Sequence, residues 1–261
     1  MEKLKKHTQY VHIPKCAGNS VLQAILGASE TKTAKVLDSV AIYKSVRQLG
    51  DFSNDFSFEE KLLIAKQNLL SFYLEQGHST ISGHFVFSPI CQRAYGHRTN
   101  FFTTLREPIK RLKSHIAYLI FAHPRTSLED YETGKVDLGE EVERIVNSSL
   151  GEWLGRTQVL YLGGLNENGK ADLHNRLKNA ILSLEKFDLI GSTDDLPDMC
   201  RKFQNKYGLN FEMQRLNTIK SVQKNDNLLD QVYSALDSLE NKLIKLSEED
   251  SILYNIAMSK K

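Results

Sequence analysis

QYVHIPKCAGNSVLQAIL, residues 9–26, contains a strand, a loop and a helix in that order. Gln9–Ile13 is a short run of β-prone residues, and Pro14 ends it because proline cannot continue a central strand. Lys15–Ser20 is a loop with one glycine, and Ser20–Leu26 has the apolar spacing of a helix. This order is typical of α/β proteins, in which helices connect the strands of a parallel sheet.

The remainder of the chain continues the alternation of strands and helices. Ser57 and Glu60 form a capping box at the start of an expected helix over residues 57–77. Pro108 occupies the first turn of another expected helix, which extends to about Phe121. Further strands are expected at residues 79–87, 100–105 and 187–191, and further helices near residues 139–149, 170–184, 194–207 and 228–246. Because parallel strands need crossover connections, this pattern predicts an α/β fold with a central parallel sheet flanked by helices.

The composition is that of an ordinary globular protein, with 41% hydrophobic and 25% charged residues. A formal net charge of +2 does not indicate nucleic-acid binding, since DNA-binding domains usually carry a stronger and clustered basic excess. Residues 123–138 are polar and are expected to form an irregular surface segment. No linker rich in Gly, Pro or Ser divides the chain, so residues 1–261 are predicted to form a single domain.

The cysteines and the N-terminus bear on the cellular location. Cys16, Cys91 and Cys200 are far apart, which excludes a disulfide framework and a zinc finger and fits a reducing compartment. The sequence has neither the apolar segment of a signal peptide nor a run long enough to span a bilayer. We therefore expect a cytoplasmic protein without a transmembrane segment. The His, Asp and Glu residues lack the spacing of metal ligands, so no metal is expected.

The loop at residues 15–20 is a candidate phosphate site. A loop between a strand and a helix N-terminus presents unpaired backbone N–H groups and the positive end of the helix dipole. Gly18 allows close approach of a ligand, Ser20 offers a hydroxyl, and Lys15 adds a positive charge. The loop is not a Walker A motif, because its lysine precedes the glycine. On spacing alone, an ordinary βα turn with a surface lysine explains the pattern equally well.

LREPIKRLKSHIAYL, residues 105–119, contains a second candidate anion site. Arg106 follows an expected strand at its C-terminal end, where open α/β sheets bind ligands. Ser114 lies two helical turns further, and an arginine fork with a hydroxyl suits a terminal phosphate. The same helix carries three more basic residues, Lys110, Arg111 and Lys113. For the two lysines a solvated helix face is the preferred explanation.

These two segments carry a resemblance to a known family. HIPKCAGNS, residues 12–20, is similar to the HIPKTGGTS loop that binds the 5′-phosphosulfate in carbohydrate sulfotransferases dependent on 3′-phosphoadenosine 5′-phosphosulfate (PAPS). That group includes the heparan sulfate 2-O- and 6-O-sulfotransferases. LREPIKRLKSHIAYL resembles the family's LRDPVERFLSHY segment, which grips the 3′-phosphate. Weaker similarities follow in order along the chain, in GRTQVLYLGG, FDLIGSTDDLPDMCRKF, LNTIKS and DSILYNIA.

The resemblance implies a P-loop-like three-layer fold and an enzyme that uses PAPS and releases adenosine 3′,5′-bisphosphate. It implies that Lys15 lies against the bridging oxygen of the phosphosulfate and that Arg106 and Ser114 hold the 3′-phosphate. The 5′-phosphate would lie against the loop residues Cys16, Ala17, Gly18, Asn19 and Ser20, with the Ser20 hydroxyl as a further donor.

Three loop residues depart from the family pattern, which often has Thr, Gly and Thr where this chain has Cys16, Ala17 and Asn19. Ala17 and Asn19 keep their backbone amides, so binding is expected to survive. A helix N-terminus lowers the pKa of a thiol, which could make Cys16 reactive. A lone cysteine more often packs, and packing is the favoured interpretation.

His84 is the candidate general base. It lies in SGHFVF, residues 82–87, which resembles the G-H-V-like segment that supplies the base in the 2-O-type enzymes. A hydroxyl acceptor must lose a proton, and histidine suits that role because its pKa is near neutrality. With eight histidines in the chain, a structural role is the alternative. His12 is expected beneath the loop and His115 to orient the helix after Arg106.

Three alternatives to a sulfotransferase stay open. A nucleotide or small-molecule kinase shares the strand–loop–helix site, but the missing GK[ST] sequence and Mg²⁺-binding aspartate count against it. A non-catalytic nucleotide- or glycan-binding relative would have no use for a base. Nucleic-acid binding through residues 106–125 ranks low, since these positive charges suit the cofactor better.

The acceptor is expected to be the hydroxyl of a glycan or another sugar-containing molecule, as the resemblance implies. Its pocket depends on the irregular segments 28–56 and 123–138. Candidate contacts are Tyr118, Arg125, Trp153 and Arg156, although a sole tryptophan is more typical of a core.

Overall fold

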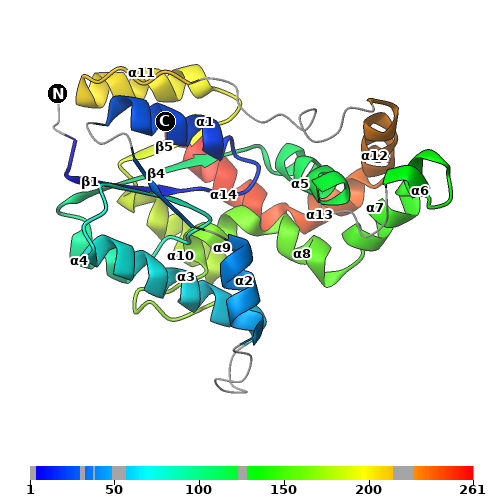
Figure 1. The fold of residues 1–261 in the computed structure, drawn as a ribbon, viewed down its shortest axis with the longest axis horizontal. Coiled ribbons are helices and arrows are strands. Elements are labelled where there is room, and N and C mark those ends of the chain that lie inside the picture. Colours follow the sequence, from blue (N-terminus) through cyan, green and yellow to red (C-terminus); the bar gives the residue numbers. More distant parts are fainter. Residues whose placement is uncertain are drawn as a thin grey trace.

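Five parallel strands form one central sheet in the order β2-β3-β1-β4-β5 (Figure 1). The computed structural model describes residues 4–29, 33–37, 39–48, 57–122, 128–213 and 226–260. The strands are β1 (His7–Val11), β2 (Lys35–Leu37), β3 (Thr80–Gly83), β4 (Thr99–Leu105) and β5 (Leu189–Ser192). The expected α/β fold with a parallel sheet flanked by helices is thereby confirmed, and one sheet is compatible with the prediction of a single domain.

Helices cover both faces of this sheet (Figure 1). The helices of the first half are α1 (Gly18–Ala28), α2 (Ser39–Gln48), α3 (Phe58–Glu75), α4 (Pro89–Tyr95) and α5 (Pro108–Ala122). They are followed by α6 (Leu128–Glu132), α7 (Leu138–Val146), α8 (Ser149–Gly155), α9 (Thr157–Gly163), α10 (Arg176–Ser183) and the 3₁₀ helix η1 (Leu184–Lys186). The last helices are α11 (Leu196–Tyr207), α12 (Asp226–Ser238), α13 (Glu240–Leu246) and α14 (Glu248–Ser259). None of the helices in the described ranges is both long and apolar enough to cross a bilayer.

The alternation of side chains along the central strand β1 produces two hydrophobic layers. Tyr10 packs with Phe102 of β4 against α1 and α11 on one face. Val11 packs with Phe101 of β4 against α9, α10 and α14 on the other face. All five residues of β1 are buried, as expected for a strand covered by helices on both sides. The arrangement is a three-layer sandwich of helices, sheet and helices.

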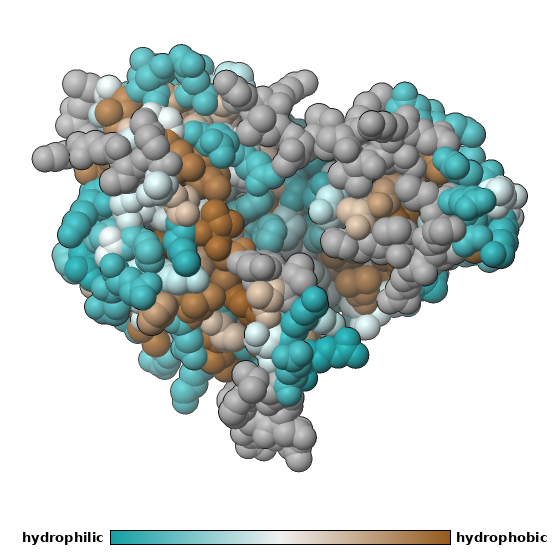
Figure 2. Space-filling view, viewed as in Figure 1, coloured by the Kyte–Doolittle hydropathy of each residue, from teal (hydrophilic) through white to brown (hydrophobic). Residues whose placement is uncertain are grey.

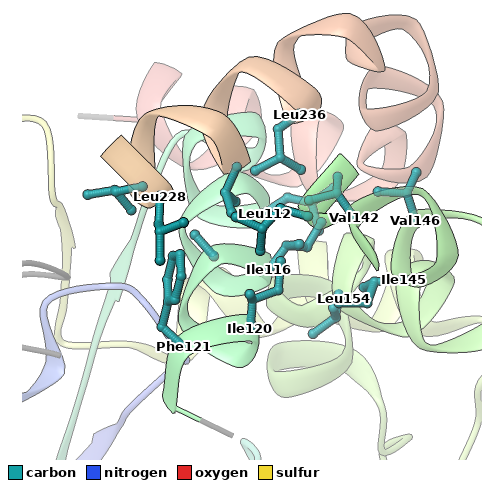
Figure 3. Packing of buried hydrophobic residues seen from close by; sticks show 14 of the residues in the cluster. Leu112, Ile116, Ile120, Phe121, Val142, Ile145, Val146, Leu154, Leu228 and Leu236 are labelled. Carbon is teal, nitrogen blue, oxygen red and sulfur yellow. The ribbon is translucent and has the colours of Figure 1, made fainter. Parts of the chain in front are cut away.

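A helical lobe extends from the sheet beyond the C-terminal ends of the strands (Figure 1). Its core is a separate cluster, mostly of leucine, isoleucine and valine side chains, from α5, α6, α7, α8, α12 and α13 (Figure 3). Leu112 and Ile116 of α5 pack there against Leu228 and Leu236 of α12. Figure 2 shows that the surface is hollowed between this lobe and the body around the sheet. The helix α5 therefore links the lobe to the end of β4.

Several expected elements are present near their predicted positions. The helix over residues 57–77 is α3, and the capping box of Ser57 and Glu60 is confirmed. Pro108 begins α5, as expected. The expected strands at residues 9–13, 100–105 and 187–191 correspond to β1, β4 and β5, and the expected helices near residues 139–149, 170–184 and 194–207 to α7, α10 and α11.

Three expectations need correction. The strand expected over residues 79–87 ends at Gly83, because the positive φ of that residue, 120°, turns the chain out of the sheet. The helix expected over residues 228–246 is two helices, α12 and α13, separated at Leu239. Within the segment 123–138, expected to be irregular, residues 128–132 form α6. LNTIKS, His123 and Arg125 lie outside the described residues.

Ser57→Ala should lower the free energy of unfolding by about 1 kcal/mol, because the N–H of Glu60 loses its acceptor. The Ser57 hydroxyl accepts from that N–H at 3.3 Å, and the Glu60 carboxylate accepts from the Ser57 N–H at 2.7 Å. Urea denaturation measures the change. Ser45→Ala, on the exposed face of α2, is the matched control and should change stability by less than about 0.5 kcal/mol. Equal midpoints for the two variants would contradict the capping role.

Candidate functional site

The loop between β1 and α1 is shaped to bind an anion through its backbone. Lys15 and Ala17 both have left-handed backbone conformations, with φ of 67° and 57°. Ala17 is the N-cap of α1 and its side chain makes no capping hydrogen bond. Successive N–H groups in such a turn converge on one point, and the helix dipole adds positive potential there. The loop predicted to bind phosphate thus contains two left-handed residues, Lys15 and Ala17, neither of which is a glycine.

Gly18 is required at the start of α1 because the ring of His12 lies against it. A Cβ atom added at Gly18 would be only 1.8 Å from His12 Nε2. The ring of His12 also stacks near Tyr10 of β1, with ring centroids 5.9 Å apart. His12 thus lies beneath the loop, as its position in the sequence suggested.

Hydrogen bonds from β4 and from the residue that follows it fix two carbonyl groups of the loop. Thr104 Oγ1 donates to the Cys16 carbonyl at 2.5 Å, and Arg106 Nη1 donates to the Lys15 carbonyl at 3.2 Å. The guanidinium of Arg106, from the second predicted anion site, therefore contacts the loop that forms the first. Ser114 is buried on α5.

Gln158 of α9 connects Arg106 to Cys16. Its Oε1 accepts from the backbone N–H of Arg106 at 2.9 Å, and its Nε2 donates to the Arg106 carbonyl at 3.1 Å. The same Oε1 accepts from the Cys16 thiol at 3.8 Å. Burial raises the pKa of Cys16 to about 12, so the thiol stays protonated and packs in the core.

The side chain of Lys15 is held by an aromatic ring. Its Nζ lies 4.2 Å from the ring centroid of Tyr118 on α5, a cation–π contact. Burial lowers the pKa of Lys15, and the charge of Arg106 lowers it further. Tyr118, expected as an acceptor contact, is therefore placed under the candidate catalytic lysine. Trp153, the other aromatic candidate, packs against the core of the helical lobe.

His84 follows β3 and faces the loop through His12. His84 Nδ1 donates to the His12 carbonyl at 2.8 Å, so the neutral ring has its lone pair on Nε2. The two imidazole centroids are 4.5 Å apart. Burial lowers the pKa of His84 to about 4, below the near-neutral value expected of a general base, so the ring is neutral above that pH and is a weaker proton acceptor than a solvated histidine. The ring is therefore oriented to accept a proton at Nε2.

Sequence reasoning missed two residues beside His84. Tyr161 of α9 meets the His84 ring edge-on, with centroids 6.2 Å apart. Lys66 of α3 is buried, and its Nζ donates to the Tyr161 hydroxyl at 3.3 Å. A lysine inside the apolar run LLIAKQNLL, residues 62–70, was the available signal. His115 is also buried, and burial holds its pKa well below the usual value, assisted by the positive charges of Arg111 and Lys15.

A fully buried ion pair lies below the loop. Arg111 Nε is 3.5 Å from Asp250 Oδ2, and neither side chain has exposed surface. Arg111 was expected on a basic helix face with Lys110 and Lys113, and the structure places it in the interior instead. Asp250 also accepts from the N–H groups of Gln158 and Val159 at 3.1 and 2.8 Å. It thereby caps α9, the helix that presents Gln158 and Tyr161.

No protein-family model matches the chain, and no curated protein matches it either. In the part of the chain that the structure describes, no three His, Cys, Asp or Glu side chains are grouped as metal ligands. The geometry above is thus the basis for assigning a function.

Removing one partner of the buried pair should cost about 3–5 kcal/mol of unfolding free energy, because the other charge is left buried alone. Arg111→Met and Asp250→Asn, with the double variant, form a thermodynamic cycle that denaturant unfolding can measure. The exposed pair Arg93–Glu167, with Nη1 2.9 Å from Oε2, is the control, and its coupling should be below about 1 kcal/mol. Similar couplings for the two pairs would refute the role given to Asp250.

Proposed function

We propose that this protein transfers a sulfuryl group from PAPS to a hydroxyl of a carbohydrate and has a P-loop-like fold. The observation that carries the proposal is that contacts connect three groups around the start of α1, His84 being linked to the loop through His12. These are the left-handed loop with Lys15, the guanidinium of Arg106, and the neutral His84 with its free lone pair on Nε2. The resemblance of HIPKCAGNS and LREPIKRLKSHIAYL to the PAPS-binding segments supports the same assignment.

PAPS, when bound, supplies an activated sulfuryl group on its 5′-phosphate. The backbone N–H groups of Ala17, Gly18 and Asn19, with Ser20, would hold that phosphate, since the turn and the helix dipole both favour an anion, whereas the N–H of Cys16 donates to the Ile13 carbonyl at 3.2 Å. Arg106 and Ser114 would hold the 3′-phosphate. Because Arg106 also bonds the Lys15 carbonyl, filling one anion site would help order the other.

In this proposal His84 is the general base and Lys15 stabilises the leaving group. His84 Nε2 takes the proton of the acceptor hydroxyl, and the hydrogen bond from Nδ1 to the His12 carbonyl keeps that nitrogen available. The ammonium of Lys15, held over Tyr118, stabilises the negative charge that develops on the 5′-phosphate oxygen. The residues therefore act by positioning and electrostatics, as in phosphoryl transfer.

Titration calorimetry should detect binding of adenosine 3′,5′-bisphosphate and not of ATP with Mg²⁺. Arg106→Ala should weaken that binding by at least about tenfold, because a charged donor to the 3′-phosphate is lost. Lys178→Ala, at an exposed position of α10, is the control and should leave the affinity unchanged. If the wild-type protein binds ATP and ignores the bisphosphate, a kinase is the better assignment.

Lys15→Ala and His84→Ala should each reduce the turnover of a PAPS-dependent reaction about 10²–10³-fold, as expected when a preorganised catalytic group is removed. Sulfate transfer from labelled PAPS to a panel of oligosaccharides measures the rate. Activity should persist in EDTA. A His84→Ala protein that retains near-normal kcat on a true acceptor would show that another group is the base.

A further inference from the structure

Lys66 is an ammonium group buried beside the candidate base. It lies in the middle of α3 with only 4% of its surface exposed. Among the described residues its Nζ bonds the Tyr161 hydroxyl, and no ion pair with a carboxylate involves it. A buried charge without a carboxylate partner is costly, so a structural role alone gives little reason for a lysine here.

One aromatic ring joins Lys66 to His84. The Lys66 Nζ is 3.3 Å from the Tyr161 hydroxyl and 4.8 Å from the centroid of the same ring. The Tyr161 ring also packs edge-on against His84, and His84 in turn packs against His12. A continuous series of rings therefore runs from Lys66 to the anion-binding loop, where His12 covers Gly18.

We infer that Lys66 tunes His84: its ammonium makes the imidazole a weaker proton acceptor, and its neutral amine restores the acceptor strength. The inference deepens the proposed function, on which it rests for the role of His84 as base. The physical reason is repulsion, because a proton taken up at Nε2 creates a second positive charge in a poorly solvated region.

Two lysines near His84 have lowered pKa values, Lys66 and Lys15, and the Lys66→Met variant separates the charge of Lys66 from that of Lys15. Burial lowers the pKa of Lys66 to about 8. The groups that act on His84 or its neighbours are His12, His115, Lys15, Tyr161 and Arg111. Burial lowers the pKa of His12 to about 3 and that of His115 well below 6.5, so both rings are neutral at pH 7–9. Burial raises the pKa of Tyr161, which therefore stays protonated.

The sign of the effect follows from these charges. Below about pH 8, Lys66 is protonated and the pKa of His84 is lowered by burial and by the Lys66 charge. Above about pH 8, that charge is lost and His84 binds a proton more readily. Removing the positive charge of Lys66, which is separated from His84 by the Tyr161 ring, should raise the pKa of His84 by about one unit.

Nuclear magnetic resonance of the His84 ring tests the coupling without any ligand. In the wild-type protein the ring signals should shift a second time near pH 8, and Lys66→Met should abolish that step and raise the acidic midpoint by about one unit. Lys61→Met, on the same helix, is the control and should keep both the shift near pH 8 and the acidic midpoint of the wild-type protein. A folded wild-type protein without the step near pH 8 overturns the inference, even where the Met variant fails to fold.

Kinetics separate this inference from the proposed function. The wild-type kcat for sulfate transfer should rise by up to about tenfold through pH 8, while Lys66→Met should show no such rise and Lys66→Arg should stay low. If His84 shows the step near pH 8 but the bisphosphate does not bind, the proposed function fails and the electrostatic coupling stands. If the bisphosphate binds and the step is absent, the coupling fails and the function stands.

Discussion

Two residues with side chains, Lys15 and Ala17, adopt left-handed backbone conformations that cost roughly 1–2 kcal/mol each, and the candidate site depends on them. Hydrogen bonds from Thr104 and Arg106 to the loop carbonyls offset part of that cost. The ring of His12 against Gly18 prevents the start of α1 from shifting. The conformation of the loop is thus supported by Thr104 of β4 and by Arg106 and His12, which follow β4 and β1.

The rigidity of the site extends into the interior through a chain of polar contacts. Asp250, near the C-terminal end of the chain, caps α9 and pairs with Arg111 of α5. The helix α9 carries Gln158, which bonds the backbone N–H and carbonyl of Arg106, and Tyr161, which packs against His84. One buried carboxylate therefore positions residues on both sides of the loop. Segments that resemble the sulfotransferase family only weakly supply these supporting contacts.

Local patterns predicted much of the fold and part of the site. The capping box at Ser57, the proline at the start of α5 and the loop before α1 depend on neighbouring residues, so the sequence shows them directly. Boundaries were less certain where local and distant effects compete. The strand after residue 79 ends at Gly83, and the last amphipathic pattern breaks at Leu239, although the apolar spacing continues through both positions.

The α/β class and the strand–loop–helix order around Lys15–Ser20 could be predicted from local sequence, because periodicity, turn residues and helix starts are short-range properties. Arg106 was predicted from its position after a strand, and His84 from the resemblance to a known family. Only the tertiary structure decided that Arg106 reaches the loop and that Cys16 is packed away. It also placed Tyr161 and Lys66 beside His84, and Arg111 with Asp250 in a buried ion pair. These residues come from helices far apart in the chain, and their environment depends on how those helices pack. Burial and the charges of distant neighbours set their protonation, and no local pattern contains that information.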